Sequence, residues 1–262
     1  MHGEKIISRH ILGVRVDRTN YRAASELISS WAEKGETRYV CVASVNNVME
    51  AHDDPDFKRI MNQADLVTPD GMPLVWGLRW LGAAGATRVY GPELTPELLA
   101  AAERKSLPVG FYGATEEVLE KLLARLRREF PALEIKFCFA PPFRPLTPEE
   151  DAQVTRQIQE SGTRLLFIGL STPKQERWME AHRGRIPAVM VGVGAAFDFL
   201  AGTKPQAPRW MREHGLEWAF RLASEPRRLW RRYLKHNPRF AVLFLRQWLS
   251  WRFAGRMNPA SA

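Results

Sequence analysis

Residues 165–194 read LLFIGLSTPKQERWMEAHRGRIPAVMVGVG, and this segment is the clearest indication of the fold class. An apolar run at 165–168 ends at Gly169, and a second run at 189–193 ends at Gly194. Between the two runs, Pro173-Lys174-Gln175-Glu176 has the residue types of a helix start, which could also hold an anion or a sugar hydroxyl. Apolar runs that end at glycine on either side of a helix predict two buried parallel strands.

The same alternation continues along most of the chain. Further strands are expected at residues 10–16, 39–43, 66–68, 109–112 and 133–139. Helices are expected after Thr19, from Asn46, after Asp54-Pro55, from Thr95-Pro96, over 115–130 and after a capping-box pattern at Thr147. This order predicts an α/β fold with a Rossmann-like, mostly parallel sheet and helices on both faces.

The last sixty residues differ from the rest in charge and composition. Residues 204–262 contain 13 Lys and Arg but only three Asp and Glu, whereas residues 1–203 contain 25 basic and 26 acidic residues. Strand patterns stop at Gly202, and prolines at 205, 208, 226 and 238 are expected to break the helices that follow. We therefore expect an α/β catalytic core over 1–203 and a basic, helical C-terminal appendage over 204–262.

The appendage also holds five of the nine tryptophans of the chain. A cationic stretch rich in Trp suits anionic lipid headgroups, diphosphates or nucleic acid. No apolar run approaches the roughly 20 residues that a spanning helix needs, and no signal peptide is visible. These features predict a cytoplasmic protein that meets a membrane only at its surface, with Cys41 and Cys138 as buried free thiols.

Three glycine-marked strand ends could hold a ligand, because open parallel sheets bind ligands at the carboxyl ends of their strands. They lie at Gly110-x-x-Gly113, at Gly169 and at Gly192-x-Gly194. Phe197 stands where a third glycine would complete a dinucleotide-binding fingerprint. Tight strand-to-helix turns explain the same glycines, so this pattern alone leaves a nucleotide-cofactor oxidoreductase as an alternative.

Two acidic motifs could carry chemistry. Asp70, in an Asp-Gly pair after a strand, is either a turn residue or a carboxylate that projects into the cleft. Asp54-x-Asp56 resembles the metal motif of many sugar transferases, but the following proline favours helix capping.

In the appendage, arginines at positions 221, 228 and 231 have spacings of seven and three, which would place them on one face of a helix. Such a face is either a solvated basic surface or a clamp for a diphosphate, because guanidinium groups match phosphate oxygens.

Taken in order, these pieces resemble the WecG/TagA/CpsF glycosyltransferases of bacterial polysaccharide and wall-polymer synthesis. The matching motifs cover roughly residues 10 to 240. They are Ser44-Val45-Asn46, Pro69-Asp70-Gly71, Arg88-Val89-Tyr90-Gly91, Gly169 to Glu176, Gly192 to Asp198, Ala207-Pro208-Arg209-Trp210, Gly215-Leu216-Glu217-Trp218, Arg221-Leu222 and Glu225-Pro226-Arg227-Arg228.

The resemblance implies a role for particular residues of this chain. Asp70 matches the aspartate regarded as the catalytic base. The expected substrate-binding residues are Ser44 and Asn46 near the sugar, Arg88, Gln175, Gly113, Gly169, Gly194 and Asp198, and, on the diphosphate, Arg221, Arg228 and Arg231.

The resemblance also implies an inverting, metal-independent transfer from a UDP-sugar to a polyprenyl-diphosphate-linked saccharide, in exopolysaccharide or cell-envelope polymer synthesis. The expected location is the inner face of the plasma membrane, on an anionic lipid surface. Ser44 replaces a usual threonine and Gln206 a frequent arginine, so the donor stays open among UDP-N-acetylmannosamine, its uronic acid and UDP-glucose. Self-association also stays open. A nucleic-acid-binding protein is the alternative from another class, although no nucleic-acid-binding motif is recognisable and no nucleic-acid partner is expected.

Overall fold

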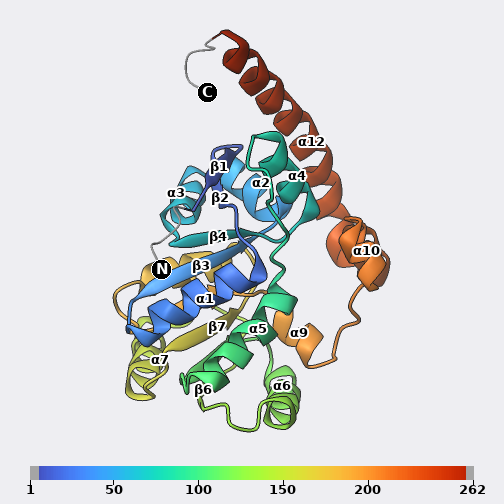
Figure 1. Cartoon of the computed structure of the whole chain (residues 1–262). Coiled ribbons are helices and arrows are strands. Elements are labelled where there is room, and N and C mark those ends of the chain that lie inside the picture. Colours follow the sequence, from blue (N-terminus) through green and yellow to red (C-terminus); the bar gives the residue numbers. More distant parts are fainter. Residues whose placement is uncertain (1–5, 258–262) are drawn as a thin grey trace.

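The computed structural model describes residues 6–257 and shows a parallel sheet between two layers of helices (Figure 1). The sheet has six strands in the order β4-β3-β8-β7-β5-β6, and every neighbouring pair is parallel. The strands are β3 (Arg38–Ala43), β4 (Leu66–Pro69), β5 (Val109–Gly113), β6 (Ile135–Phe139), β7 (Leu165–Gly169) and β8 (Val189–Gly192). The predicted α/β, Rossmann-like fold is confirmed.

The first predicted strand is wrong in one respect. Instead of one strand over residues 10–16, the chain forms an antiparallel hairpin of β1 (Ser8–Ile11) and β2 (Val14–Asp17) outside the main sheet. Leu12 and Gly13 both have positive φ, 50° and 86°. Two consecutive residues of positive φ make the tight turn whose twist suits a hairpin.

One layer of helices covers the face of the sheet to which Val40 and Val42 point. It consists of α1 (Tyr21–Glu33), α5 (Gly91–Arg104), α6 (Glu116–Glu129) and the short α9 (Ala196–Leu200). Phe111 and Phe167, on neighbouring strands, stack at the centre of this core with ring centroids 5.4 Å apart. Because strand side chains alternate, the residues between these ones point to the opposite layer.

The opposite layer packs on Cys41 and Ala43 of β3. It consists of α2 (Val45–Asp53), α3 (Pro55–Gln63), α4 (Met72–Trp80), α7 (Pro148–Glu160) and α8 (Lys174–His182), together with the hairpin. Cys41 is buried here as expected, but Cys138 is exposed because β6 is an edge strand and the side chain of Cys138 points away from this core.

Several helices begin directly after a residue whose side chain caps them. Thr147 forms the predicted capping box, and the side chain of Asp54 accepts a hydrogen bond from the amide of Phe57 at 3.0 Å. Two starts were predicted wrongly: Asn20, not Thr19, caps α1, and α5 begins at Gly91 with Pro96 inside the helix. Pro92, near the start of α5, is the proline that marks the helix terminus.

Three helices follow the core: α10 (Arg209–Glu213), α11 (Glu217–Ser224) and α12 (Pro226–Met257). Pro226 begins α12, whereas Pro238 lies inside this helix and does not end it as predicted. Phe240 and Phe244 bury one side of α12 against the core, and Phe244 stacks on Trp80 of α4. The C-terminal end of α12 projects beyond the sheet layers (Figure 1). Within residues 6–257, no helix is both long and apolar enough to cross a bilayer.

Candidate active site

The candidate residues gather because five neighbouring strands end at the same edge of the sheet. Asp70 follows β4, Ser44 follows β3 and Gly194 follows β8, while Gly169 and Gly113 end β7 and β5. The carboxyl ends of parallel strands form the usual ligand-binding crevice of this architecture. The edge therefore collects, from distant parts of the sequence, the groups that the motifs singled out.

Asp70 is held firmly at this edge by its backbone. Its amide donates to the carbonyl of Ala43 at 2.8 Å, which continues the pairing of β3 with β4. Its side chain is 24% exposed, so the carboxyl group lies mostly out of water. Burial raises the pKa of Asp70 to about 7, and the negative charge of Glu217 acts in the same direction against the opposing effect of Arg88.

Arg88 binds Asp70 and anchors the appendage. The amide of Val89 donates to the carbonyl of Pro69 at 2.9 Å, which places Arg88 beside Asp70. The guanidinium donates to the Asp70 carbonyl, to its carboxylate at 3.3 Å, and to the carboxylate of Glu217 on α11. It also lies over the ring of Tyr90, 4.1 Å from the centroid. Since Arg88 is only 15% exposed, these contacts take place largely away from water.

A second arginine approaches Asp70 from α11. Arg221 lies one helical turn after Glu217, so both side chains point to the same side of the helix. Its positive charge acts on the carboxyl of Asp70, and its Nε is buried without a hydrogen-bond partner within the protein. A buried, unpaired donor is unfavourable by about 1–3 kcal/mol, which an anionic ligand would offset.

The centre of the edge is a buried polar network. Asn47 of α2 donates to Glu176 Oε1 at 2.8 Å and to Thr172 Oγ1 at 3.1 Å. Gln175 donates to the same Glu176 oxygen at 3.0 Å and accepts from the amide of Gly194 at 3.1 Å. Burial raises the pKa of the Glu176 carboxyl, while these hydrogen bonds oppose the rise. The network ties the loops after β3, β7 and β8 together.

The Ser44–Asn46 segment begins α2 beside this network. The hydroxyl of Ser44 donates to Asn47 Oδ1 at 2.8 Å within a capping box, so it is already used in the protein. Asn46 is different, because its Oδ1 is buried and accepts no hydrogen bond within the protein. Of Ser44 and Asn46, it is therefore Asn46 whose Oδ1 can accept a hydrogen bond from a hydroxyl or amide of a ligand.

Two of the strand-end glycines are explained by close packing. A Cβ on Gly113, where φ is 129°, would lie 2.6 Å from the carbonyl of Gly169. A Cβ on Gly169 would lie 2.4 Å from the ring of Phe197. Phe197 therefore fills the space where a dinucleotide fingerprint would need a third glycine, and the geometry favours tight turns at these two strand ends.

The three appendage arginines do not share one helical face, contrary to the spacing prediction. The chain turns at Glu225-Pro226, which leaves Arg221 on α11 and the other two on α12. Arg228 is exposed and pairs with Glu225, and Arg231 is exposed with its guanidinium 5.2 Å from the centroid of Trp230. Only Arg221 faces Asp70, so contacts of Arg228 and Arg231 with a diphosphate stay a prediction.

Asp198 lies where the core meets the appendage. Its carboxylate pairs with Lys204 at 3.2 Å, and its carbonyl accepts from the amide and the hydroxyl of Thr203. These contacts fix the direction in which the chain leaves α9. The substrate role expected for Asp198 stays a prediction.

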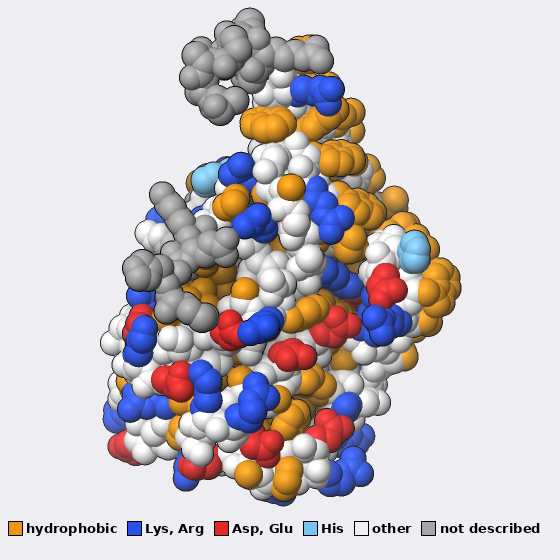
Figure 2. Space-filling model, viewed as in Figure 1, with side chains coloured by type: hydrophobic (Ala, Val, Ile, Leu, Met, Phe, Trp, Pro, Cys, Tyr) orange, Lys and Arg blue, Asp and Glu red, His pale blue; other side chains and the backbone are white. Residues whose placement is uncertain are grey.

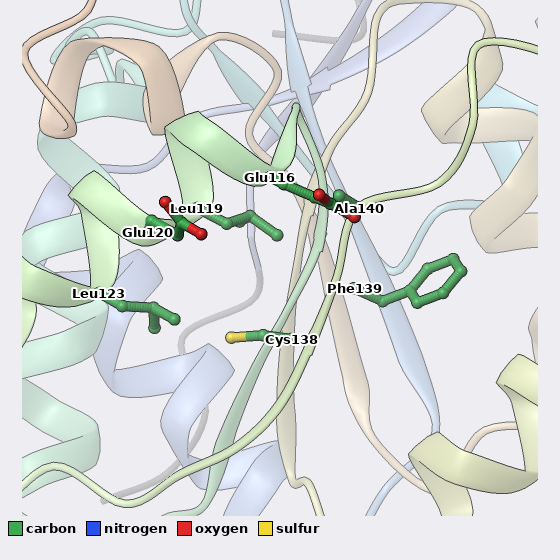
Figure 3. Close-up of a pocket in the computed structure, with 7 residues that line it drawn as sticks. All are labelled: Glu116, Leu119, Glu120, Leu123, Cys138, Phe139 and Ala140. Carbon is green, nitrogen blue, oxygen red and sulfur yellow. The ribbon is translucent and has the colours of Figure 1, made fainter.

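Neither the acidic Asp54-x-Asp56 motif nor the pocket at the far edge of the sheet joins the site. Asp54 caps α3 and pairs with Arg177 at 2.6 Å. In the part of the chain that the structure describes, three or more His, Cys, Asp or Glu side chains do not cluster in a way that could hold a metal ion. A pocket between α6 and β6 is drawn in Figure 3, where Glu116 and Glu120 come from the helix and Cys138 from the strand. It lies beside the edge opposite to β4 and contains none of the expected site residues.

Several residues of the site were not singled out from the sequence. Glu217 and Glu176 occurred only inside longer motifs, and Asn47 and Thr172 were assigned no role. Each is polar and at least partly buried, and each contacts a predicted residue or its neighbour. Spacing could not find them, because their partners are up to 129 residues away in the sequence.

Comparison with known proteins identifies the family to which this chain is related. The profile of the Glycosyl transferase WecG/TagA/CpsF family matches residues 9–254. The chain is 30% identical over 233 residues to a Staphylococcus aureus protein named N-acetylglucosaminyldiphosphoundecaprenol N-acetyl-beta-D-mannosaminyltransferase, covering 88% of this chain and 89% of that one. A Bacillus spizizenii protein of the same name is 29% identical over 223 residues, covering 85% of this chain and 84% of that protein. The chain therefore belongs to the WecG/TagA/CpsF family of glycosyltransferases.

Proposed function

We propose that this protein transfers a sugar from a UDP-sugar to a polyprenyl-diphosphate-linked saccharide, with inversion at the anomeric carbon and with Asp70 as the general base. The observation that carries the proposal is the mostly buried carboxyl of Asp70 at a strand end, with a pKa of about 7. A general base works best when its pKa lies near the working pH. The family match favours this transfer over the oxidoreductase and nucleic-acid-binding alternatives.

The reaction is a single displacement. Asp70 accepts the proton of an acceptor hydroxyl while that oxygen forms a bond to the anomeric carbon of the donor. The bond from this carbon to the β-phosphate oxygen breaks, and UDP leaves with the electron pair. Negative charge grows on the departing diphosphate, and fixed cations lower the energy of that state. Arg221 lies near Asp70 and has a buried, unpaired Nε, so among the residues that the structure describes it is best placed to stabilise the departing diphosphate.

The names of the relatives support a donor of the N-acetylhexosamine class. Both act, by name, on an N-acetylglucosaminyl-diphosphoundecaprenol and transfer an N-acetylmannosaminyl group. The free acceptor oxygen of Asn46 suits the amide N–H of an acetamido sugar. We therefore propose UDP-N-acetylmannosamine as the first donor to test, with UDP-glucose and the uronic acid as comparisons.

We further propose that α12 holds the protein on an anionic membrane surface at the cytoplasmic face. Exposed apolar side chains recur at spacings of three, four or eight residues, which place them on one outward side of the helix, at Trp230, Leu234, Val242, Leu245, Leu249 and Phe253. Figure 2 shows this apolar strip beside the basic side chains of the helix and next to the apolar surface of α10. Such a helix binds a lipid interface by burying its apolar side while basic groups meet the headgroups.

The base assignment is tested by Asp70→Asn, which keeps the shape of the side chain and removes its basicity. Transfer should fall by about 10²–10⁴-fold, while binding of UDP, measured by calorimetry, persists. Asp54→Asn is the matched control, because asparagine still caps a helix and Asp54 lies away from the site. Near-normal transfer by Asp70→Asn would refute the assignment. Full activity in EDTA is expected for both the wild type and the control.

A further inference from the structure

Glu217 is a second carboxylate that shares a cation with Asp70. It lies in the first turn of α11 and reaches the same guanidinium nitrogen of Arg88 that contacts the Asp70 carboxylate. Glu217 is 12% exposed and Arg88 is 15% exposed, so the contact is shielded from water. The other terminal nitrogen of Arg88 donates to the carbonyl of Arg212 at 3.3 Å. Through Arg88, the base is therefore connected to both α10 and α11.

The charges that face Asp70 come from two parts of the chain. From the core come Arg88 and Tyr90, and from α11 come Glu217 and Arg221. Burial raises the pKa of the Tyr90 hydroxyl, with Glu217 and Asp70 acting in the same direction, so Tyr90 stays neutral in this surrounding. The remaining groups are two carboxylates and two guanidinium groups, and removing one carboxylate leaves Asp70 alone with two cations.

We propose that Glu217 is a positioning residue of the transfer: by binding Arg88 from α11, it leaves Asp70 more ready to accept a proton. The inference rests on the proposed function and extends it to a residue that never needs to touch substrate. The appendage then contributes a negative charge to the site as well as positive ones.

The physical basis is competition for one guanidinium group. Without Glu217, Arg88 pairs with Asp70 alone and holds its carboxylate in the charged form, which is a weak base. With α11 in place, Glu217 takes part of the donor capacity of Arg88 and adds a negative charge near Asp70. Both effects favour protonation of Asp70, because a like charge nearby raises a carboxyl pKa and an opposite charge lowers it.

A purely structural role for Glu217 would have a different signature. If Glu217 only fastened α11 to the core, its loss would lower stability and overall rate without changing the pH at which Asp70 titrates. The measurement must therefore follow the proton on Asp70. It must also be readable without turnover, so that an error in the proposed function does not hide the answer.

The experiment uses the full chain labelled with ¹³C at the aspartate carboxyl carbons, and follows Asp70 by NMR from pH 4 to 9. Asp70→Asn identifies the resonance. In Glu217→Gln we expect the pKa of Asp70 to fall by about one pH unit or more. Glu217→Asp keeps the charge and should restore the wild-type value. The matched control is Glu213→Gln, because Glu213 is exposed on α10 and pairs with Arg209.

The pH profile of kcat/KM provides the second readout. A base must be deprotonated to act, so activity rises with pH through the pKa of Asp70. In Glu217→Gln this rise should move to lower pH by the same amount, and the plateau should fall because a weaker base accepts the proton less readily. Melting curves verify that the variant is folded.

An unchanged Asp70 titration in folded Glu217→Gln would overturn the inference. A titration that moves in NMR while the pH profile of transfer stays fixed would instead contradict Asp70 as the base, which separates the two failures. The inference is supported if Glu217→Gln shifts both the Asp70 titration and the pH profile of kcat/KM to lower pH. Glu217→Asp should then restore both, and Glu213→Gln should change neither.

Discussion

The helices α11 and α12 are neighbours in a single basic segment, yet they differ in where their charges point. On α11, Glu217 and Arg221 face the Asp70 carboxyl inside the structure. On α12, Arg239 pairs with Asp53 on the surface while the outward side is apolar. The two tasks expected of the appendage, completing the site and binding a membrane, can therefore be assigned to different helices and tested separately.

Removing the whole appendage would not separate these tasks. Phe240 and Phe244 of α12 are part of the core cluster, and Gln247 bonds to the hairpin at Leu12 and His10. Deletion of residues 204–262 would uncover apolar surface on α4 and around Ile11. Substitutions in the full chain therefore separate site completion from membrane binding better than deletion does.

The largest effect on stability is expected for Arg88→Met, which breaks the link between the core and α11. Two mostly buried carboxylates, Asp70 and Glu217, then lack their shared cation, which should lower the free energy of unfolding by roughly 3 kcal/mol and the Tm by about 6–10 °C. The deficit should shrink as the pH falls from 8 to 5, because Asp70, whose pKa in the folded state is raised, takes up a proton and no longer needs the cation.

The control for this variant is Arg209→Met, which breaks the exposed pair with Glu213. It should leave the Tm almost unchanged at every pH. An equal fall in Tm for Arg88→Met and Arg209→Met would mean that the ion pairs of Arg88 contribute no more to stability than an exposed surface pair.

The second effect concerns the outward side of α12. Leu245→Glu with Leu249→Glu should weaken binding to vesicles that contain anionic lipid by about a hundredfold or more, because each leucine contributes roughly 1.5–3 kcal/mol when buried. Co-sedimentation with vesicles measures this. Both side chains are exposed, so the melting curve should not change. Phe143→Glu, at an exposed apolar side chain outside the appendage, provides the comparison and should leave vesicle binding intact.

The smallest effect is expected for Arg239→Met, at the surface contact of α12 with α2. Arg239 binds both oxygens of Asp53 at 2.8 Å and holds the pKa of that carboxyl below its usual range. A lowered pKa contributes stability above about pH 4 that is lost as the pH falls through the folded-state value. We expect the Tm to drop by no more than about 2 °C at pH 7, and by less still at pH 3. A larger drop would show that α12 depends on this pair rather than on Phe240 and Phe244.

Sequence patterns predicted the sheet well because its signals are local. Apolar runs that end at glycine, and caps such as Thr147 and Asp54, depend on a few neighbouring residues. The hairpin was mistaken for one strand because Leu12 adopts a positive φ, which its residue type disfavours.

The candidate site was only partly predictable. Asp70 and the strand-end glycines could be located, because the carboxyl edge of a parallel sheet is a general feature. The contacts of Arg88 with Glu217 and of Asn47 with Glu176 join residues 129 apart, so they depend on tertiary packing. The arginine spacing was misread because a helix break at Glu225-Pro226 changes the direction of the chain.

We propose that α11 completes the active site and that α12 binds the membrane. The most direct measurement compares kcat/KM on a water-soluble, short-chain acceptor with kcat/KM on the same saccharide in vesicles, for Arg221→Met and for the Leu245→Glu, Leu249→Glu variant. We predict that Arg221→Met loses about a hundredfold or more on both acceptors, and that the α12 variant loses activity only on vesicles. Wild-type activity of Arg221→Met on the soluble acceptor would show that α11 is not part of the site, and an equal loss on both acceptors by the α12 variant would show that α12 is not only a membrane anchor.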